Sequence, residues 1–159
     1  MREKKAFLVL AVVLIVAADA GSQTTSVNAG EDEVKVTLAV TQVLGAQVKA
    51  WNRHDLEAFM AGYWNSPGLT FFSGANQRHG WQATMDRYQT TYQSPGHEMG
   101  KLEFSNLGVE ALGGDAAFVR GEWHLTMSDG KTPHGLFTLV FRKFPDGWKI
   151  IHDHTSAAE

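Results

Sequence analysis

The segment from His134 to Ser156, HGLFTLVFRKFPDGWKIIHDHTS, constrains the fold more than any other part of the chain. Its centre, Phe144-Pro-Asp-Gly-Trp148, has the chemistry of a tight turn, because proline presets φ and glycine readily takes a positive φ. Apolar and polar residues alternate on both sides of the turn, as they do in half-buried strands. The segment therefore predicts an antiparallel hairpin in which Phe144 lies opposite Trp148.

That pairing divides the hairpin into two faces. The first is apolar except at its end and consists of Phe137, Leu139, Phe141, Ile151, Asp153 and Thr155. The second carries Thr138, Val140, Arg142, Ile150, His152 and His154. Because side chains alternate across a strand, Asp153 is predicted to lie among apolar neighbours. A lone carboxylate on an apolar sheet face is the most distinctive chemical feature of the sequence.

Two more strands are predicted to precede the hairpin. Residues 101–112 alternate, but their apolar parity switches near Ser105-Asn106, which predicts a β-bulge and a sharp bend. Residues 116–127 form the next strand. If Met127 lies opposite Lys131, Trp123 joins the apolar face, whereas a register shifted by one residue would exchange the two faces.

Three helices are predicted before these strands. They cover residues 31–51, residues 55–63 with Asp55 as N-cap, and residues 80–92, with a short strand at 69–73 and a return strand at 77–79 between the last two. Their apolar stripes are predicted to form the core. The stripes consist of Val34, Leu38, Thr41, Val48 and Trp51, then Leu56, Phe59, Met60 and Tyr63, then Trp81, Met85, Tyr88 and Tyr92.

The N-terminus has the pattern of an export signal. A basic start is followed by an unbroken apolar run at residues 6–18 and by Ala18-Asp-Ala20, which fits a cleavage site. We therefore expect a signal peptide at residues 1–20, a disordered leader at 21–30, and a periplasmic or secreted protein without a membrane span after cleavage. An uncleaved anchor is the alternative, although the apolar run is short for a span. The chain has no cysteine, which excludes disulfides.

Two motifs resemble a known family. Asn52-Arg-His-Asp-Leu56 and the closing segment Gly147–Ser156 resemble the SnoaL-like branch of the nuclear transport factor 2-like superfamily. Relatives there include ketosteroid isomerase, polyketide cyclases and the association domain of calcium/calmodulin-dependent kinase. The resemblance implies one α+β domain over residues 31–156, with a cone-shaped, strongly bent antiparallel sheet wrapped around three N-terminal helices. It does not specify a function, because this fold hosts enzymes, binding modules and assembly domains.

Asp153 has two interpretations. Inside the cone, desolvation would raise its pKa and make it a usable general acid or base. A structural carboxylate would instead be hydrogen-bonded to a backbone amide or a tyrosine, as buried carboxylates usually are. The residues predicted to surround a ligand beside the candidate catalytic Asp153 are Tyr63, Trp64, Trp81, Tyr88, Trp123, Phe137, Leu139, Phe141 and Thr155.

The opposite sheet face carries four histidines. They are His124, His134, His152 and His154. Imidazoles on adjacent strands can bind zinc or copper, but the last two lie away from the first two, so we assign no metal site and no cofactor. The resemblance implies a homodimer through this face, and its half-apolar surface favours an interface. The net charge of −3 and the absence of a basic stripe argue against nucleic-acid binding.

Three functions are compatible with the sequence. The first is an exported isomerase- or cyclase-like enzyme that acts on an apolar substrate through Asp153 without a cofactor. The second is a non-catalytic dimer that binds a small hydrophobic or carboxylated ligand. The third is an assembly domain without a ligand.

Overall fold

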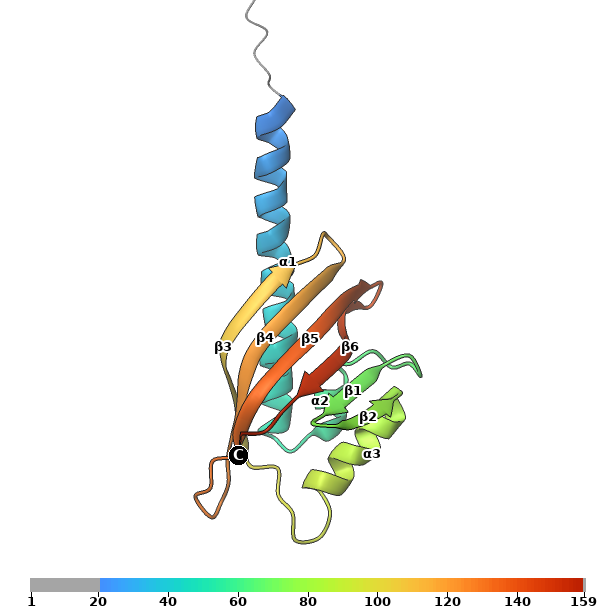
Figure 1. Ribbon diagram of the computed structural model, residues 1–159, viewed down its shortest axis with the longest axis vertical. Coiled ribbons are helices and arrows are strands. Elements are labelled where there is room, and N and C mark those ends of the chain that lie inside the picture. Colours follow the sequence, from blue (N-terminus) through green and yellow to red (C-terminus); the bar gives the residue numbers. More distant parts are fainter. Residues whose placement is uncertain (1–20, 159) are drawn as a thin grey trace, which may run out of the picture.

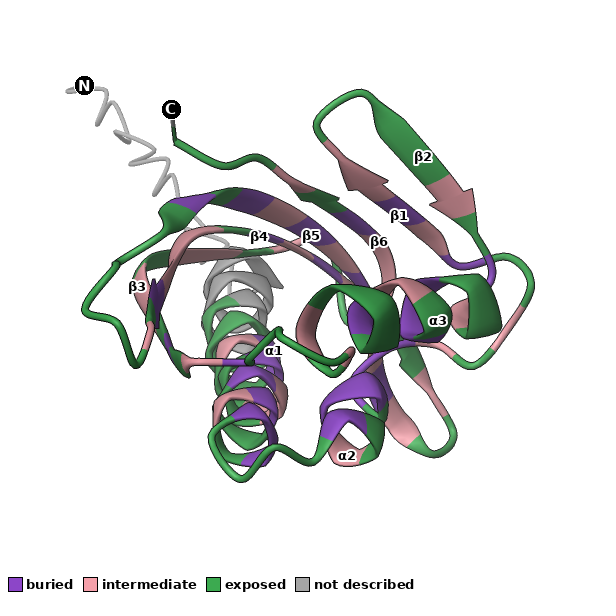
Figure 2. Ribbon diagram, turned by 90° about the horizontal axis from the view of Figure 1, so that it is seen from below, coloured by how far each residue is buried: buried purple, intermediate pink, exposed green. Residues whose placement is uncertain are grey.

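The computed structural model describes residues 21–158, with side chains from residue 30 onward, so the predicted signal peptide lies outside the described residues. Nine elements follow one another in this part of the chain: α1 (Gly21–Trp51), α2 (Leu56–Met60), β1 (Thr70–Ser73), β2 (Asn76–His79), α3 (Trp81–Tyr92), β3 (Lys101–Ala111), β4 (Ala116–Thr126), β5 (His134–Phe144) and β6 (Gly147–Thr155). The α+β prediction is confirmed. A curved, open sheet lies against the three helices (Figures 1 and 2).

The six strands are ordered β2-β1-β6-β5-β4-β3. The four long strands are antiparallel, as predicted, but β1 pairs with β6 in parallel, with Thr70 opposite His152 and Phe71 opposite Asp153. The sheet is therefore mixed rather than purely antiparallel. This arrangement makes β6 an interior strand with a neighbour on each side.

The β5–β6 hairpin has two different registers along its length. At the turn Phe144 pairs with Gly147, not with Trp148, and Phe141 pairs with Ile150. A bulge then shifts the pairing, and Leu139 lies opposite Asp153 as predicted. The turn is one residue tighter than predicted and the bulge compensates for it. As a result Ile150, predicted for the outer face, is fully buried, and Ile151 is only half-buried.

The other strand predictions are confirmed. The β3–β4 register shifts between Ser105 and Gly108, where Asn106 takes a φ of 51°, and this bulge bends the sheet. The backbone N–H of Met127 donates to the carbonyl of Lys131 at 2.9 Å. This turn fixes the register that places Trp123 on the concave side.

The three helices form near the predicted positions, but α2 ends at Met60 rather than at residue 63, and α1 buries a different face. Asp55 caps α2 by accepting a hydrogen bond from the Ala58 backbone N–H at 3.0 Å, and the α2 stripe is buried as predicted. In α1, however, Val34 and Leu38 are each 59% exposed. The buried stripe is Val36, Val40, Leu44, Gln47 and Trp51, which keeps helical spacing on a different face.

Helix α1 also begins earlier than predicted. It starts at Gly21 and so includes residues 21–30, for which the composition had indicated a disordered leader. Once a packed segment is helical, each further turn adds hydrogen bonds without a new nucleation cost. The beginning of α1 extends past the sheet (Figure 1). Within the described residues, no helix combines the length and apolar character that a membrane crossing requires.

Candidate functional site

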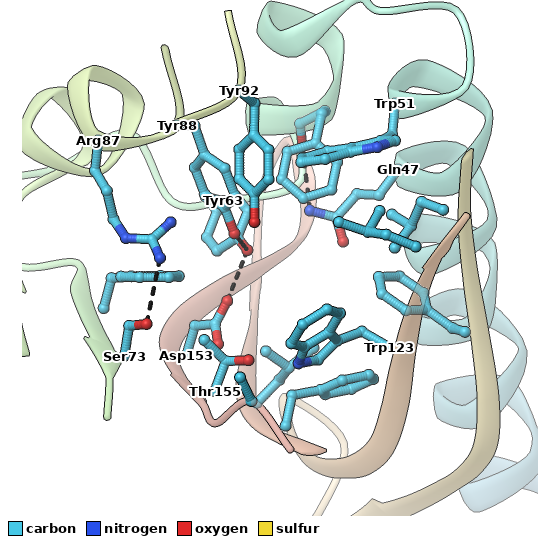
Figure 3. Close-up of a pocket in the computed structure, with 18 of the residues that line it drawn as sticks. Gln47, Trp51, Tyr63, Ser73, Arg87, Tyr88, Tyr92, Trp123, Asp153 and Thr155 are labelled. Atoms are coloured by element: carbon cyan, nitrogen blue, oxygen red, sulfur yellow. Dashed lines mark hydrogen bonds between the residues drawn. The ribbon is translucent and has the colours of Figure 1, made fainter. Parts of the chain in front are cut away.

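A cavity of about 200 Å³ lies between the concave face of the sheet and the helices. Most of its wall is aromatic or aliphatic. The lining side chains include Trp51, Phe59, Tyr63, Phe71, Tyr88, Tyr92, Leu102, Phe104, Trp123, Leu125, Phe137 and Leu139, and the polar positions are Gln47, Ser73, Arg87, Asp153, Thr155 and Ser156. Figure 3 shows Asp153 below the Tyr63 and Tyr88 hydroxyls, with Arg87 and Ser73 to one side and Trp123 to the other.

Asp153 is the carboxylate of this cavity. It lies in β6 and is only 4% exposed. Its Oδ2 accepts a hydrogen bond from the Tyr63 hydroxyl at 2.7 Å. Its Oδ1 is buried and has no hydrogen-bond partner among the described residues. Each interpretation from the sequence therefore describes one oxygen: Oδ2 accepts a hydrogen bond from a tyrosine, whereas Oδ1 is desolvated and has no partner within residues 30–158.

Backbone pairing brings Tyr63 to Asp153. Tyr63 follows α2 and forms a bridge with Ile150 of β6, in which the Ile150 N–H donates to Gly62 and the Trp64 N–H donates to Ile150. The Tyr63 hydroxyl also lies 3.3 Å from the hydroxyl of Tyr88 on α3. Because the Tyr63 hydroxyl donates its hydrogen bond to Asp153, the Tyr88 hydroxyl is the donor in the hydrogen bond to Tyr63. Two hydroxyls thus connect α3 to the carboxylate.

Burial controls the protonation of these groups. It raises the pKa of Asp153 from its ordinary value of 3.8 to about 7, although the Tyr63 hydrogen bond and the charge of Arg87 both lower it. Burial, followed by the charge of Asp153, also raises the pKa of Tyr63 and of Tyr88. The tyrosines therefore remain neutral donors at neutral pH, while Asp153 is poised to gain or lose a proton.

Arg87 provides the positive charge of the cavity. Its guanidinium lies 4.9 Å from the ring centre of Phe71 and 5.5 Å from that of Tyr88. One of its nitrogens, Nη2, donates to the Ser73 hydroxyl at 3.2 Å. Stacking on two rings holds the guanidinium in place.

The residues after β6 close one side of the cavity. The carbonyl of Ser156 accepts a hydrogen bond from the Trp123 indole at 3.0 Å. The backbone N–H of Ser156 donates to Leu136, and that of Ala158 donates to His134, each at 2.9 Å. This short tail therefore continues the pairing with β5 beyond the end of the strand.

Six of the nine predicted ligand-contacting residues line the cavity. They are Tyr63, Tyr88, Trp123, Phe137, Leu139 and Thr155. The other three do not line the cavity. Trp64 stacks on Phe144, the Trp81 indole donates to the Met60 carbonyl, and Phe141 is fully buried in the core. Contact between the six lining residues and a ligand stays a prediction.

Sequence reasoning missed several lining residues. Gln47 lies on the buried face of α1 and donates to the Phe59 carbonyl at 3.2 Å, so a correct helical phase would have found it. Arg87 lies next to Tyr88 on α3, but a charged residue beside an apolar stripe is usually a solvated one. Ser156 and Ala157 carried no signal, since they follow the last strand.

The outer-face histidines lie in two separate places. His124 and His134 are cross-strand neighbours, as predicted, with ring centres 5.7 Å apart. His152 lies elsewhere, beside Thr70 and Phe72. Across residues 21–158 there is no group of three His, Cys, Asp or Glu side chains that could hold a metal ion.

Comparison with known proteins identifies the family. The model of the SnoaL-like domain matches residues 40–159. A nuclear transport factor 2-like protein of unknown function from Shewanella oneidensis is 38% identical, with a TM-score of 0.70 over 76% of this chain and 98% of that one. No curated protein matches the sequence.

More distant structures share the fold alone. A superfamily member from Salmonella enterica is 20% identical, with a TM-score of 0.62 over 79% of this chain and 93% of that one. A Novosphingobium aromaticivorans protein named as a proposed aromatic ring hydroxylase is 17% identical, with a TM-score of 0.64 over 79% and 91% of the two chains. The family match and the Shewanella relative confirm the resemblance seen in the sequence. The chain belongs to the SnoaL-like family of the nuclear transport factor 2-like superfamily.

Proposed function

We propose that the protein binds a small, mainly apolar molecule in the cavity and moves a proton to or from it through Asp153, as an isomerase- or cyclase-like enzyme. The observation that supports this proposal is the buried Oδ1 of Asp153 in the cavity wall, which has no partner within residues 30–158. Structural carboxylates in protein interiors normally have their oxygens satisfied, and a buried polar atom without a partner costs about 1–3 kcal/mol. A ligand donor would satisfy Oδ1.

The two oxygens of Asp153 have different tasks in this proposal. Oδ2 is fixed by the Tyr63 hydroxyl, which orients the carboxyl group. Oδ1 exchanges the proton with the bound molecule. A group with a pKa near 7 exists in both forms at neutral pH, so it can serve as acid or base. The proposed chemistry needs no cofactor.

The alternative is a binding module that uses the same cavity without turnover. The hydrogen bond from Tyr63 to Asp153 suits that role equally, since it would hold a ligand-recognising carboxylate. The two functions respond differently to a variant in which residue 153 cannot ionise. Such a variant of the enzyme binds its substrate without converting it, whereas a binding module changes only in affinity.

Titration of Asp153 tests the acid–base proposal directly. The side-chain carboxyl carbon of Asp153 can be followed by ¹³C NMR from pH 3 to pH 9, and its signal can be assigned by its loss in Asp153→Asn. We expect it to titrate with a midpoint near 7, because burial disfavours the charged form. A midpoint at or below 4 would mean an ionised structural carboxylate. That result would contradict the proposed proton transfer.

We also propose a homodimer through the outer face of the sheet. Leu136 is 60% exposed there and lies on the same face of β5 as the half-buried Val140, which pairs with the half-buried Phe118. Leu136→Glu should convert dimers into folded monomers in light scattering with unchanged circular dichroism, because a charge in the interface would be desolvated. Leu112→Glu, at a 50% exposed position beyond the end of β3, is the matched control. A monomeric wild type would contradict the dimer.

Export is a further proposal, supported by the pattern of residues 1–20 alone. It would place the cavity in the periplasm or the extracellular medium. The mature chain would then begin at Gly21.

A further inference from the structure

Arg87 is a cation in the cavity wall that the described part of the protein does not neutralise. Among the described residues no carboxylate lies within ion-pair distance of its guanidinium, and the side chain that accepts its hydrogen bond is the neutral Ser73 hydroxyl. A guanidinium carries five N–H donors in a planar fork that matches a carboxylate. Both Arg87 and Ser73 line the cavity, so the guanidinium can bind an anion there in addition to the Ser73 hydroxyl.

The size of the cavity limits what can occupy it. A dry cavity of roughly 150 Å³ accommodates benzene, so about 200 Å³ accommodates one six-membered ring with a small substituent. Aromatic side chains such as Trp51, Phe59 and Trp123 suit such a ring, because offset and edge-to-face contacts are favourable. A larger molecule would extend beyond this volume through the open side of the cavity.

We propose, on the basis of the function above, that the ligand is a small aromatic carboxylate whose anionic group binds Arg87 and Ser73 and whose ring lies among the aromatic side chains. Asp153 lies beside this anion-binding group, because Phe71 and Ser73 of β1 pair with Asp153 and Thr155 of β6. The site thus has anion-binding side chains on α3 and β1 next to a proton-transfer group on β6. Figure 3 shows Arg87 and Ser73 on one side of Asp153 and Trp123 on the other.

The charge at Arg87 and the protonation of Asp153 influence each other. The charge of Arg87 lowers the pKa of Asp153, so an anion that neutralises Arg87 raises this pKa further. The other titratable groups that line the cavity, Tyr63, Tyr88 and Tyr92, have raised pKa values and stay neutral. An anionic ligand therefore favours the protonated form of Asp153, which can donate a hydrogen bond or a proton to it.

Benzoate and its neutral isostere benzamide test the proposal. The purified protein, labelled with ¹⁵N, is titrated with each probe at pH 7. The indole N–H signals of Trp51 and Trp123, which line the cavity, report binding. The indole signal of Trp64, which stacks on Phe144 outside the cavity, is the control. We expect benzoate to bind about tenfold more tightly than benzamide, as a charge-assisted hydrogen bond implies. Arg87→Met should remove this preference and leave benzamide binding within about twofold of the wild type.

Several outcomes would overturn the inference. Equal affinities of the wild type for the two probes would show that Arg87 does not select an anion. If Arg87→Met weakened the binding of benzoate and benzamide equally, Arg87 would only shape the cavity. Arg87→Lys keeps the positive charge and should retain part of the preference for benzoate over benzamide. This variant replaces Arg87→Met if Arg87→Met does not fold. Binding of neither probe would contradict the proposed function as well, whereas equal binding of both contradicts this inference alone.

Discussion

Asp153→Asn is expected to abolish turnover while ligand binding largely survives, and to make the protein more stable than the wild type at pH 8. Asparagine has nearly the same shape and can still accept the hydrogen bond from Tyr63, but it can neither gain nor lose a proton. A proton-transfer enzyme therefore loses its chemical step. A binding module would show altered affinity and no activity to lose.

The direction of the stability effect is set by the raised pKa. The folded protein holds the Asp153 proton up to about pH 7, whereas the unfolded chain releases it near 3.8. Between these values the folded state binds more protons, so the wild type loses stability as pH rises from about 4 to about 7, by about 4 kcal/mol at most. Above that window the cost is constant. Asparagine has no such cost, so the variant should gain about 1–3 kcal/mol at pH 8 and nothing at pH 4.

Melting curves of both proteins at pH 4, 6 and 8, with turnover and ligand binding measured on the same samples, check this prediction. If Asp153 is an ionised structural residue, the variant should instead lose about 1–3 kcal/mol at pH 8, because a buried hydrogen bond to a charge is weakened. Such a loss would contradict the catalytic role.

Gly135→Ala is expected to detach the short tail that closes one side of the cavity. A Cβ at position 135 would lie 1.9 Å from the carbonyl oxygen of Ser156 and 2.9 Å from the Cα of Ala157. These are backbone atoms, so the tail must move as a unit. Three hydrogen bonds depend on its position, those from the Trp123 indole and from the Ser156 and Ala158 amides. Their loss should destabilise the protein by roughly 2–4 kcal/mol and open the cavity to solvent.

Hydrogen exchange measures this effect residue by residue. The amides of Ser156 and Ala158 should lose their protection in Gly135→Ala, and benzoate should dissociate faster. Gly108→Ala is the matched control, because an added Cβ there would have no neighbour within 4 Å. Protection of the tail unchanged from the wild type would refute the steric argument.

The sequence predicted the parts of the fold that depend on local patterns. The switch in apolar parity predicted the β3 bulge, and capping chemistry predicted the role of Asp55. Turn length predicted the register of Met127 with Lys131. Each of these signals is visible within a few residues. The concave position of Asp153 was also predicted correctly. That success depended on the bulge near Ile151, which corrected a turn assigned one residue too long.

The features that the sequence did not reveal depend on distant contacts. Apolar residues occur on more than one side of α1, so periodicity alone did not show which side is buried. The buried side carries Val40 and Leu44, whereas the side with Leu38 is exposed. The parallel pairing of β1 with β6 left no local pattern. Arg87 was missed because its place in the cavity depends on Phe71 and Ser73 of β1.

The parallel pairing of β1 with β6 has a consequence for the order in which the protein folds. It joins Thr70 to His152 and Ser73 to Thr155, segments separated by most of the domain. Pairings so remote in sequence require a large loop to close first, and they form slowly for that reason. Until this pairing forms, β1 and β6 each present an unpaired edge, which is a hazard for association between chains. Phe71 of β1 pairs with Asp153, so the cavity wall around this carboxylate is complete only when β1 joins the sheet.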